Sequence, residues 1–136
     1  MTTQVGNNAQ FVAPQKGLTI IGDHAYAFSG AFGSTTSSQT MLQFTTGDGY
    51  IVGKLTMSGA VSFASVGGLK TAFQVSLNGN VIALSLFDNQ TDHASSLNRL
   101  NILLPPYSTV TVECDSDDTN AGAKSTAVFV GKVYDN

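Results

Sequence analysis

Apolar and polar residues alternate with a period of two along most of the chain after residue 23, and Gly, Ser, Asn and Asp interrupt the alternation at short intervals. Because successive side chains of a strand point to opposite faces, this pattern is typical of antiparallel strands with one buried face. No stretch keeps a helical period between typical helix caps. Strands are expected at residues 24–33, 39–46, 50–59, 70–77, 81–87, 97–104, 108–114 and 125–134. The pattern therefore predicts an all-β protein of eight strands.

Two turn signals indicate how these strands are connected. Asn78-Gly79 is a strong hairpin signal, because both residues tolerate positive φ. Pro105-Pro106 cannot continue a ladder and must turn a corner. Both fit an eight-stranded antiparallel β-sandwich with jelly-roll topology, in which the fourth and fifth strands are neighbours and the next connections cross between sheets. The short Gly-Asp-Gly turn at residues 47–49 favours the competing interpretation, an up-and-down barrel or an immunoglobulin-like sandwich.

The first 22 residues differ in character from the rest. Residues 1–22 are rich in Gly, Asn, Gln and Thr and predict an extended N-terminal arm before a β-sandwich domain at residues 23–136. Phe11 and Val12 are large apolar side chains in a polar segment, and Pro14 holds the chain extended behind them. We expect Phe11, Val12 and Pro14 to bind a partner; the alternative is a terminus without fixed structure. The first ten residues show no secretory signal.

The composition points to contacts with other proteins. Charged residues make up 11% of the chain, against about 25% in ordinary soluble domains, and uncharged polar groups cost less to desolvate than ions. A net charge of −3 with six Lys and Arg argues against nucleic-acid binding, which needs clustered cations. No segment reaches the ~18 consecutive apolar residues of a membrane span. We expect a closed homo-oligomer, in particular a trimer.

The stretch at residues 113–122 concentrates acidic groups and raises the question of a calcium loop. Asp115, Asp117 and Asp118 lie within four positions, but an EF-hand needs Gly at position six and Glu at position twelve. Counting from Asp115, these positions hold Asn120 and Thr126. A loose calcium site in which the three aspartates converge is one interpretation. A solvated turn, in which Asp and Asn cap their own backbone, explains the same residues more simply.

No catalytic constellation is found, and we expect neither an enzyme nor a cofactor. Asp92, His93, Ser95 and Ser96 contain the residue types of a hydrolytic triad, but neighbours on one loop cannot supply its geometry. No nucleophile elbow surrounds either serine. Glu113 is the only glutamate, so a glycosidase pair of carboxylates on rigid elements is not apparent.

A cysteine and a histidine are further candidate site residues. The single cysteine, Cys114, excludes an internal disulfide and is expected to be a small buried strand residue. His24 follows Asp23 at a strand start without a second histidine at ligand spacing, so we interpret it as a polar residue at a strand edge.

Several segments together resemble a known class of protein. The runs LQFTTGDGYIVGKL, LNGN, LPPYSTVTV and VFVGKVY, between residues 39 and 134, are similar to small virion structural proteins of bacteriophages and other aquatic viruses built as single jelly rolls or related β-sandwiches. The resemblance consists of strand and turn patterns and contains no catalytic signature. It implies a capsid decoration (cement) or vertex protein in the virion, trimeric and bound to the major capsid protein or another virion protein. A receptor- or glycan-binding spike head is the alternative.

Overall fold

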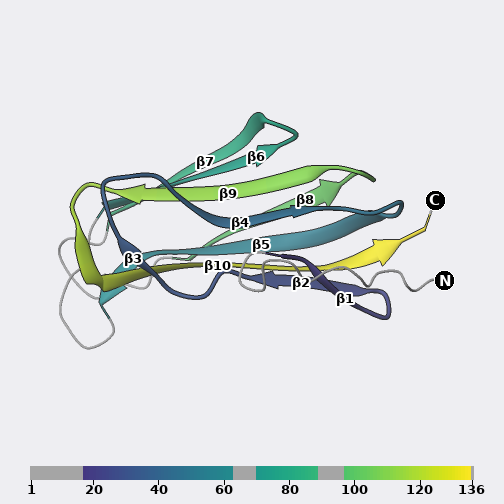
Figure 1. Ribbon diagram of the computed structural model, residues 1–136, viewed down its shortest axis with the longest axis horizontal. Helices are drawn as coiled ribbons and strands as arrows, with labels where there is room; N and C mark the ends of the chain where they lie inside the picture. Colours follow the sequence, from purple (N-terminus) through teal and green to yellow (C-terminus); the bar gives the residue numbers. More distant parts are fainter. Residues whose placement is uncertain (1–16, 63–69, 89–96, 136) are drawn as a thin grey trace.

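The computed structural model describes residues 17–62, 70–88 and 97–135 (Figure 1). These residues contain strands and no helix, and therefore no helix that could cross a membrane. The strands are β1 (Thr19–Ile21), β2 (His24–Phe28), β3 (Phe32–Ser34), β4 (Gln39–Thr45), β5 (Tyr50–Ser62), β6 (Lys70–Leu77), β7 (Asn80–Asp88), β8 (Leu97–Leu104), β9 (Thr109–Ser116) and β10 (Asn120–Tyr134).

The strands form two antiparallel sheets that pack as a sandwich (Figure 1). We call sheet A the one with the order β1-β2-β10-β5-β8, in which β3 also pairs with β10, and sheet B the one with the order β4-β9-β6-β7. If β2 and β4 to β10 are taken as the eight jelly-roll strands B to I, the two orders are B-I-D-G and C-H-E-F. This is the strand order of a jelly roll, so the preferred fold is confirmed.

The described part of the chain contains ten strands rather than the eight predicted. The expected strand at residues 24–33 is divided into β2 and β3, because the backbone leaves the ladder around Gly30, which has a φ of 74°. The other additional strand is β1, which pairs with β2. Leu18 and Ile20 pack against the core, so the sandwich begins within the segment predicted as arm. Phe11, Val12 and Pro14 lie outside the described residues.

The short turn at residues 47–49 connects the two sheets, because β4 belongs to sheet B and β5 to sheet A. The up-and-down barrel and the immunoglobulin-like sandwich, which this turn favoured in the sequence, are therefore wrong. The β4–β5 and β8–β9 connections run side by side and are joined through Thr46. Its buried Oγ1 donates to the carbonyl of Pro105 at 2.7 Å and accepts from the N–H of Ser108 at 2.8 Å. The N–H of Tyr107 donates to the carbonyl of Gly47 at 2.9 Å. A tight turn can therefore cross between sheets, because a second connection satisfies its polar groups.

The Asn78-Gly79 hairpin is confirmed. It joins β6 to β7, and its two residues have φ angles of 53° and 85°. The side-chain oxygen of Asn78 accepts a hydrogen bond from the N–H of Thr109 at 2.9 Å, which ties the hairpin to β9. The two strands that the turn connects form one edge of sheet B.

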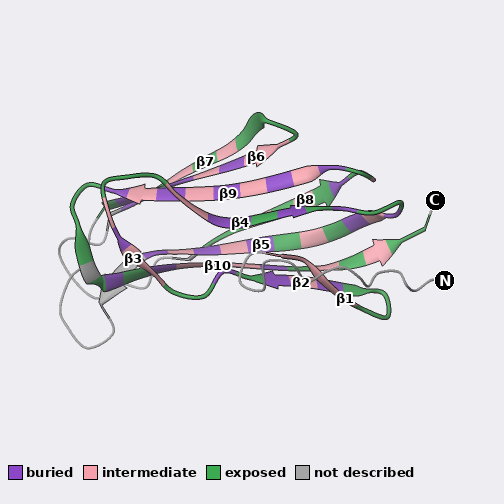
Figure 2. Ribbon diagram, viewed as in Figure 1, coloured by how far each residue is buried: buried purple, intermediate pink, exposed green. Residues whose placement is uncertain are grey.

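Alternate residues of most strands are buried between the sheets (Figure 2). The rings of Phe44 in sheet B and Phe129 in sheet A meet across the sandwich, with centroids 5.4 Å apart. Cys114 is buried among these side chains, as predicted, and no disulfide is formed. The buried cluster comprises Ala25, Ala27, Met41, Leu42, Phe44, Ile51, Leu55, Met57, Phe73, Val75, Phe87, Leu104, Val110, Val112, Cys114, Ala127 and Phe129.

Candidate interaction surfaces

The acidic stretch forms the turn between β9 and β10. The carboxylate of Asp118 accepts a hydrogen bond from the N–H of Thr119 at 2.8 Å, and the side-chain oxygen of Asn120 accepts one from the N–H of Gly122 at 2.9 Å. These side chains cap their own backbone, as the simpler interpretation predicts. Among the described residues, no group of three or more His, Cys, Asp and Glu side chains is arranged to hold a metal ion.

The other polar candidates are not brought together. His24 lies exposed at the start of β2, with its Nε2 3.4 Å from a carboxylate oxygen of Asp23. The second oxygen of Asp23 is 3.6 Å from the ammonium of Lys132. Glu113 lies in β9 with its side chain on the outer face of sheet B, opposite Gln74. The predicted triad types at residues 92–96 lie outside the described residues.

Exposed apolar side chains are more distinctive than any polar cluster. Among the residues whose burial is described, eleven large hydrophobics are exposed, and nine of them gather in two regions of the surface. The first region is the outer face of sheet A, with Ile21, Phe28, Val52, Leu103 and Val130. The second is strand β7, with Val81, Ile82, Leu84 and Leu86. Scattered surface hydrophobics are common, whereas gathered ones mark interaction sites.

The outer face of sheet A combines apolar and cationic side chains. Directly opposite residues of an antiparallel pair point to the same face, so Val52 has Leu103 on one side and Lys132 on the other. In the next row of that face, Val130 lies between Lys54 and Tyr26. This face therefore carries cations beside apolar residues, although the whole chain is net negative.

Strand β7 is an edge strand whose exposed side chains between Val81 and Phe87 are apolar. It pairs with β6 on one side and has no described neighbour in the sheet on the other. Leu84 and Leu86 are 73% and 70% exposed, the largest values among the exposed hydrophobic residues other than Tyr107. Residues 81–87 contain no charge and no proline, two of the devices that prevent edge strands from pairing with other chains.

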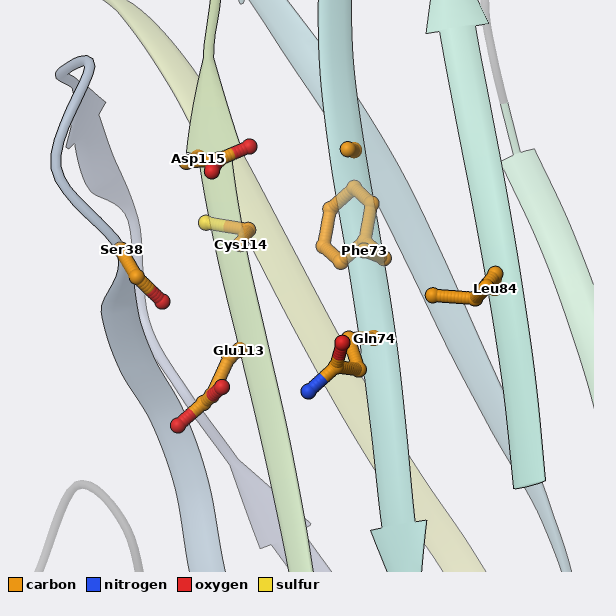
Figure 3. A pocket seen from close by; sticks show the side chains of 8 residues that line it. Ser38, Phe73, Gln74, Leu84, Glu113, Cys114 and Asp115 are labelled. Atoms are coloured by element: carbon orange, nitrogen blue, oxygen red, sulfur yellow. The ribbon is translucent and has the colours of Figure 1, made fainter. Parts of the chain in front are cut away.

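A shallow hollow of about 120 Å³ lies on the outer face of sheet B beside β7 (Figure 3). Leu84 borders it on β7, Gln74 lies on the neighbouring β6, and Glu113 lies on β9. Its remaining lining residues are Ser38, Ala72, Phe73, Cys114 and Asp115. The hollow is bordered by one exposed leucine and by acidic and amide groups, and it contains no exposed aromatic ring that could stack on a sugar.

An exposed tyrosine, Tyr107, lies at the end of the sandwich where the β4–β5 and β8–β9 connections meet. Tyr107 is 71% exposed and has a φ of 56°, which is costly for a residue with a large side chain. The ring of Tyr107 is therefore exposed rather than packed at the corner formed by Pro105 and Pro106. In the same structure, Tyr50 and Tyr134 stack with ring centroids 5.2 Å apart.

Comparisons with known proteins assign no family to the chain. No family model matches the chain, and a search of curated proteins finds no match. Among solved structures, latent PorU from Porphyromonas gingivalis aligns with a TM-score of 0.46 and 16% identity over 83% of this chain and 13% of that chain. VP2 of infectious bursal disease virus aligns with a TM-score of 0.39 and 12% identity over 79% of this chain and 30% of that chain. A family 35 carbohydrate-binding module from Clostridium thermocellum aligns with a TM-score of 0.37 and 12% identity over 79% and 70% of the two chains.

These neighbours include a viral capsid protein and a carbohydrate-binding module, and the likeness to them concerns the β-sandwich alone. The chain spans less than a third of the PorU and VP2 chains. No decoration protein of a bacteriophage is among the three structures described.

Strand β7 was not predicted as a surface, although its sequence contains a signal. Residues 81–87 have apolar side chains at both odd and even positions, which is typical of a central strand buried on both faces. The structure instead puts this strand at the edge of sheet B, where Leu84 and Leu86 point away from the core. An edge strand with apolar side chains on both of its faces indicates a further contact.

Proposed function

We propose that this chain is a structural protein of a virus particle, a capsid decoration (cement) or vertex protein whose activity is binding rather than catalysis. The sandwich supplies a rigid body, and the N-terminal arm attaches it to the major capsid protein or another virion protein. The particle is thereby stabilised through many copies of a weak contact.

The gathering of exposed apolar residues on sheet A and β7 is the observation that carries this proposal. Nine large apolar side chains in two regions favour a protein whose surface is covered by other protein. The low content of charged residues in the whole chain favours the same role, because uncharged groups cost less to desolvate than ions. The runs quoted above, which resemble small virion jelly rolls, point in the same direction.

Deletion of residues 1–13 tests attachment through the arm. Burial of a Phe side chain is worth roughly 1.5–3 kcal/mol per copy, and a repeating lattice multiplies the effect through effective concentration. The truncated protein should keep its melting temperature, because the described sandwich begins after the deleted residues, and should lose binding to purified particles or empty capsids. A matched deletion of residues 1–9 keeps Phe11, Val12 and Pro14 and should still bind.

Two results would refute the role of the arm. If the protein without residues 1–13 binds particles as well as the full chain, attachment depends on the sandwich instead. If that protein unfolds, the deleted residues belong to the domain core.

A receptor- or glycan-binding spike head is the second candidate, and the exposed ring of Tyr107 favours it. Sugar rings stack on aromatic faces, and a strained backbone that presents such a ring is common at binding sites. A glycan-binding screen of the full chain tests this alternative. Binding that is lost in Tyr107→Ala and kept in Phe28→Ala, an exposed aromatic on sheet A, would favour the spike-head function.

A further inference from the structure

We propose that β7 binds a second copy of this chain, so that two sheets B join edge to edge into one antiparallel sheet of eight strands. This inference goes beyond the proposed function, because it concerns contact between copies and not attachment to a particle. The two β7 strands are related by a twofold axis, which makes the interface self-complementary and closed.

The backbone of β7 provides the first argument. A strand at a sheet edge presents unpaired N–H and C=O groups, and long, uncharged, apolar edges pair with other chains unless they are protected. The other edge of sheet B, β4, carries polar side chains on its exposed face at Gln43 and Thr45. The edge strand β8 of sheet A carries the exposed cation Arg99. Among the longer edge strands, β7 thus combines the most exposed leucines with an uncharged run.

The register of β7 provides the second argument. The β6–β7 ladder shifts between Val75 and Ser76, so that Ile82 is the extra residue of a bulge. Pairing is regular from Ala83 onward. A twofold axis at Ser85 then places Leu84 opposite Leu86 of the partner subunit, and places Leu86 opposite the partner's Leu84. The two most exposed leucines of the strand therefore cover each other, on the outer face of the joined sheet.

The positions of the charges favour an edge contact over a contact between outer faces. Glu113 and Asp115 of β9 lie on the outer face of sheet B, so stacking two such faces would bring carboxylates together. In the edge-to-edge pair, β9 of one copy lies five strand spacings from β9 of the other, about 24 Å. This distance exceeds the Debye length of about 8 Å at physiological ionic strength, so the carboxylates do not repel strongly. A second copy therefore fits the edge.

The geometry also revises the trimer expected from composition. A twofold strand pair closes at two copies, because each chain has one β7 and each β7 has one edge without a described neighbour. Single strand pairs bury a small interface, so we expect dimers that form at micromolar concentration and dissociate on dilution.

The experiment measures the molar mass of the full chain by light scattering and sedimentation. The wild type is expected at twice 14.1 kDa, and Leu84→Lys/Leu86→Lys at 14.1 kDa, because like charges lie opposite each other across the axis. Leu84→Lys/Leu86→Glu is expected to remain dimeric, because the proposed register puts an ammonium opposite a carboxylate twice. Leu103→Lys, on the edge strand β8, is the matched control and should leave the dimer intact.

Circular dichroism and melting curves establish that each variant is folded. Should the lysine variant unfold, Leu84→Thr/Leu86→Thr removes the apolar contact while keeping strand-forming side chains, and it should also be monomeric. A monomeric wild type at micromolar concentration would overturn the proposal. An oligomer whose mass changes neither in Leu84→Lys/Leu86→Lys nor in Leu84→Thr/Leu86→Thr would overturn it as well, as would a trimer.

Discussion

The ring of Phe129 lies against the backbone of Gly53, so that a Cβ atom added at Gly53 would be 2.6 Å from the ring's Cζ atom. Gly131 lies directly opposite Gly53 in the neighbouring strand, and a Cβ there would be 2.8 Å from a methyl group of Ile51. Two small residues on β5 and β10 thus leave room for the ring that meets Phe44 from the other sheet. The ring of Phe129 therefore fits closely between the backbone of its own sheet and the ring of Phe44.

Gly53→Ala is therefore expected to destabilise the fold. The added methyl group would lie 2.6 Å from both the ring of Phe129 and the carbonyl oxygen of Val130, so both must shift, and overpacking of this kind costs about 1–3 kcal/mol. Urea unfolding measures the change in the free energy of unfolding. Gly47→Ala is the control, because no atom lies within 4 Å of its added Cβ, and it should leave stability unchanged or slightly higher. Equal stability of the two variants would contradict the close packing at Gly53.

Thr46→Val tests the hydrogen bonds that join the β4–β5 connection to the β8–β9 connection. The substitution keeps the side-chain shape but removes the hydroxyl that serves the carbonyl of Pro105 and the N–H of Ser108. Leaving buried polar groups unsatisfied costs about 1–3 kcal/mol. Thr45→Val removes the exposed hydroxyl contact to Thr109 and should change stability by less than about 0.5 kcal/mol. Similar melting temperatures for both variants would show that the crossings hold without this contact.

The stability of the fold should fall in alkaline solution in a way that depends on Cys114. Burial, and secondarily the charge of Asp115, raises the pKa of the Cys114 thiol from 9.0 to about 11. The folded state therefore keeps the proton more tightly than the unfolded state, so this contribution is complete below pH 9 and is lost as the pH rises towards 11. Unfolding free energies of the wild type and Cys114→Ala, measured from pH 8 to 11, should converge as the pH rises. Parallel curves would contradict the raised pKa.

Calcium is expected to have no effect on the β9–β10 turn. Asp118 and Asn120 already accept hydrogen bonds from the backbone of the turn, so the loop is held without an ion. A ligand at 100 times its dissociation constant would stabilise the fold by about 2.7 kcal/mol. Melting curves with calcium and with a chelator should therefore coincide. A loss of melting temperature on chelation, absent in Asp117→Asn/Asp118→Asn, would show that the turn is a calcium site.

The sequence by itself determined the strands and most of their turns. Seven of the eight expected strands agree with the structure within a few residues, because alternating burial requires alternating side chains, as in β6 and β9. The Asn78-Gly79 hairpin was also predictable from the sequence, since few residue types tolerate the positive φ angles of its turn. The capped turn around Asp118 was also predicted, since Asp and Asn bond to their local backbone in a recognisable spacing.

Tertiary structure alone decided which strands are central and which are edges. The two-residue period of a strand shows which residues share a face, but it does not show which strands are its neighbours in the sheet. Residues 81–87 have apolar side chains of the kind found in a central strand, and only the order β4-β9-β6-β7 leaves Leu84 and Leu86 in solvent. The crossing at residues 47–49 likewise depends on Thr46 meeting Pro105, a residue 59 positions away. Long-range pairing sets these features, because contacts between distant segments leave no local pattern in the chain.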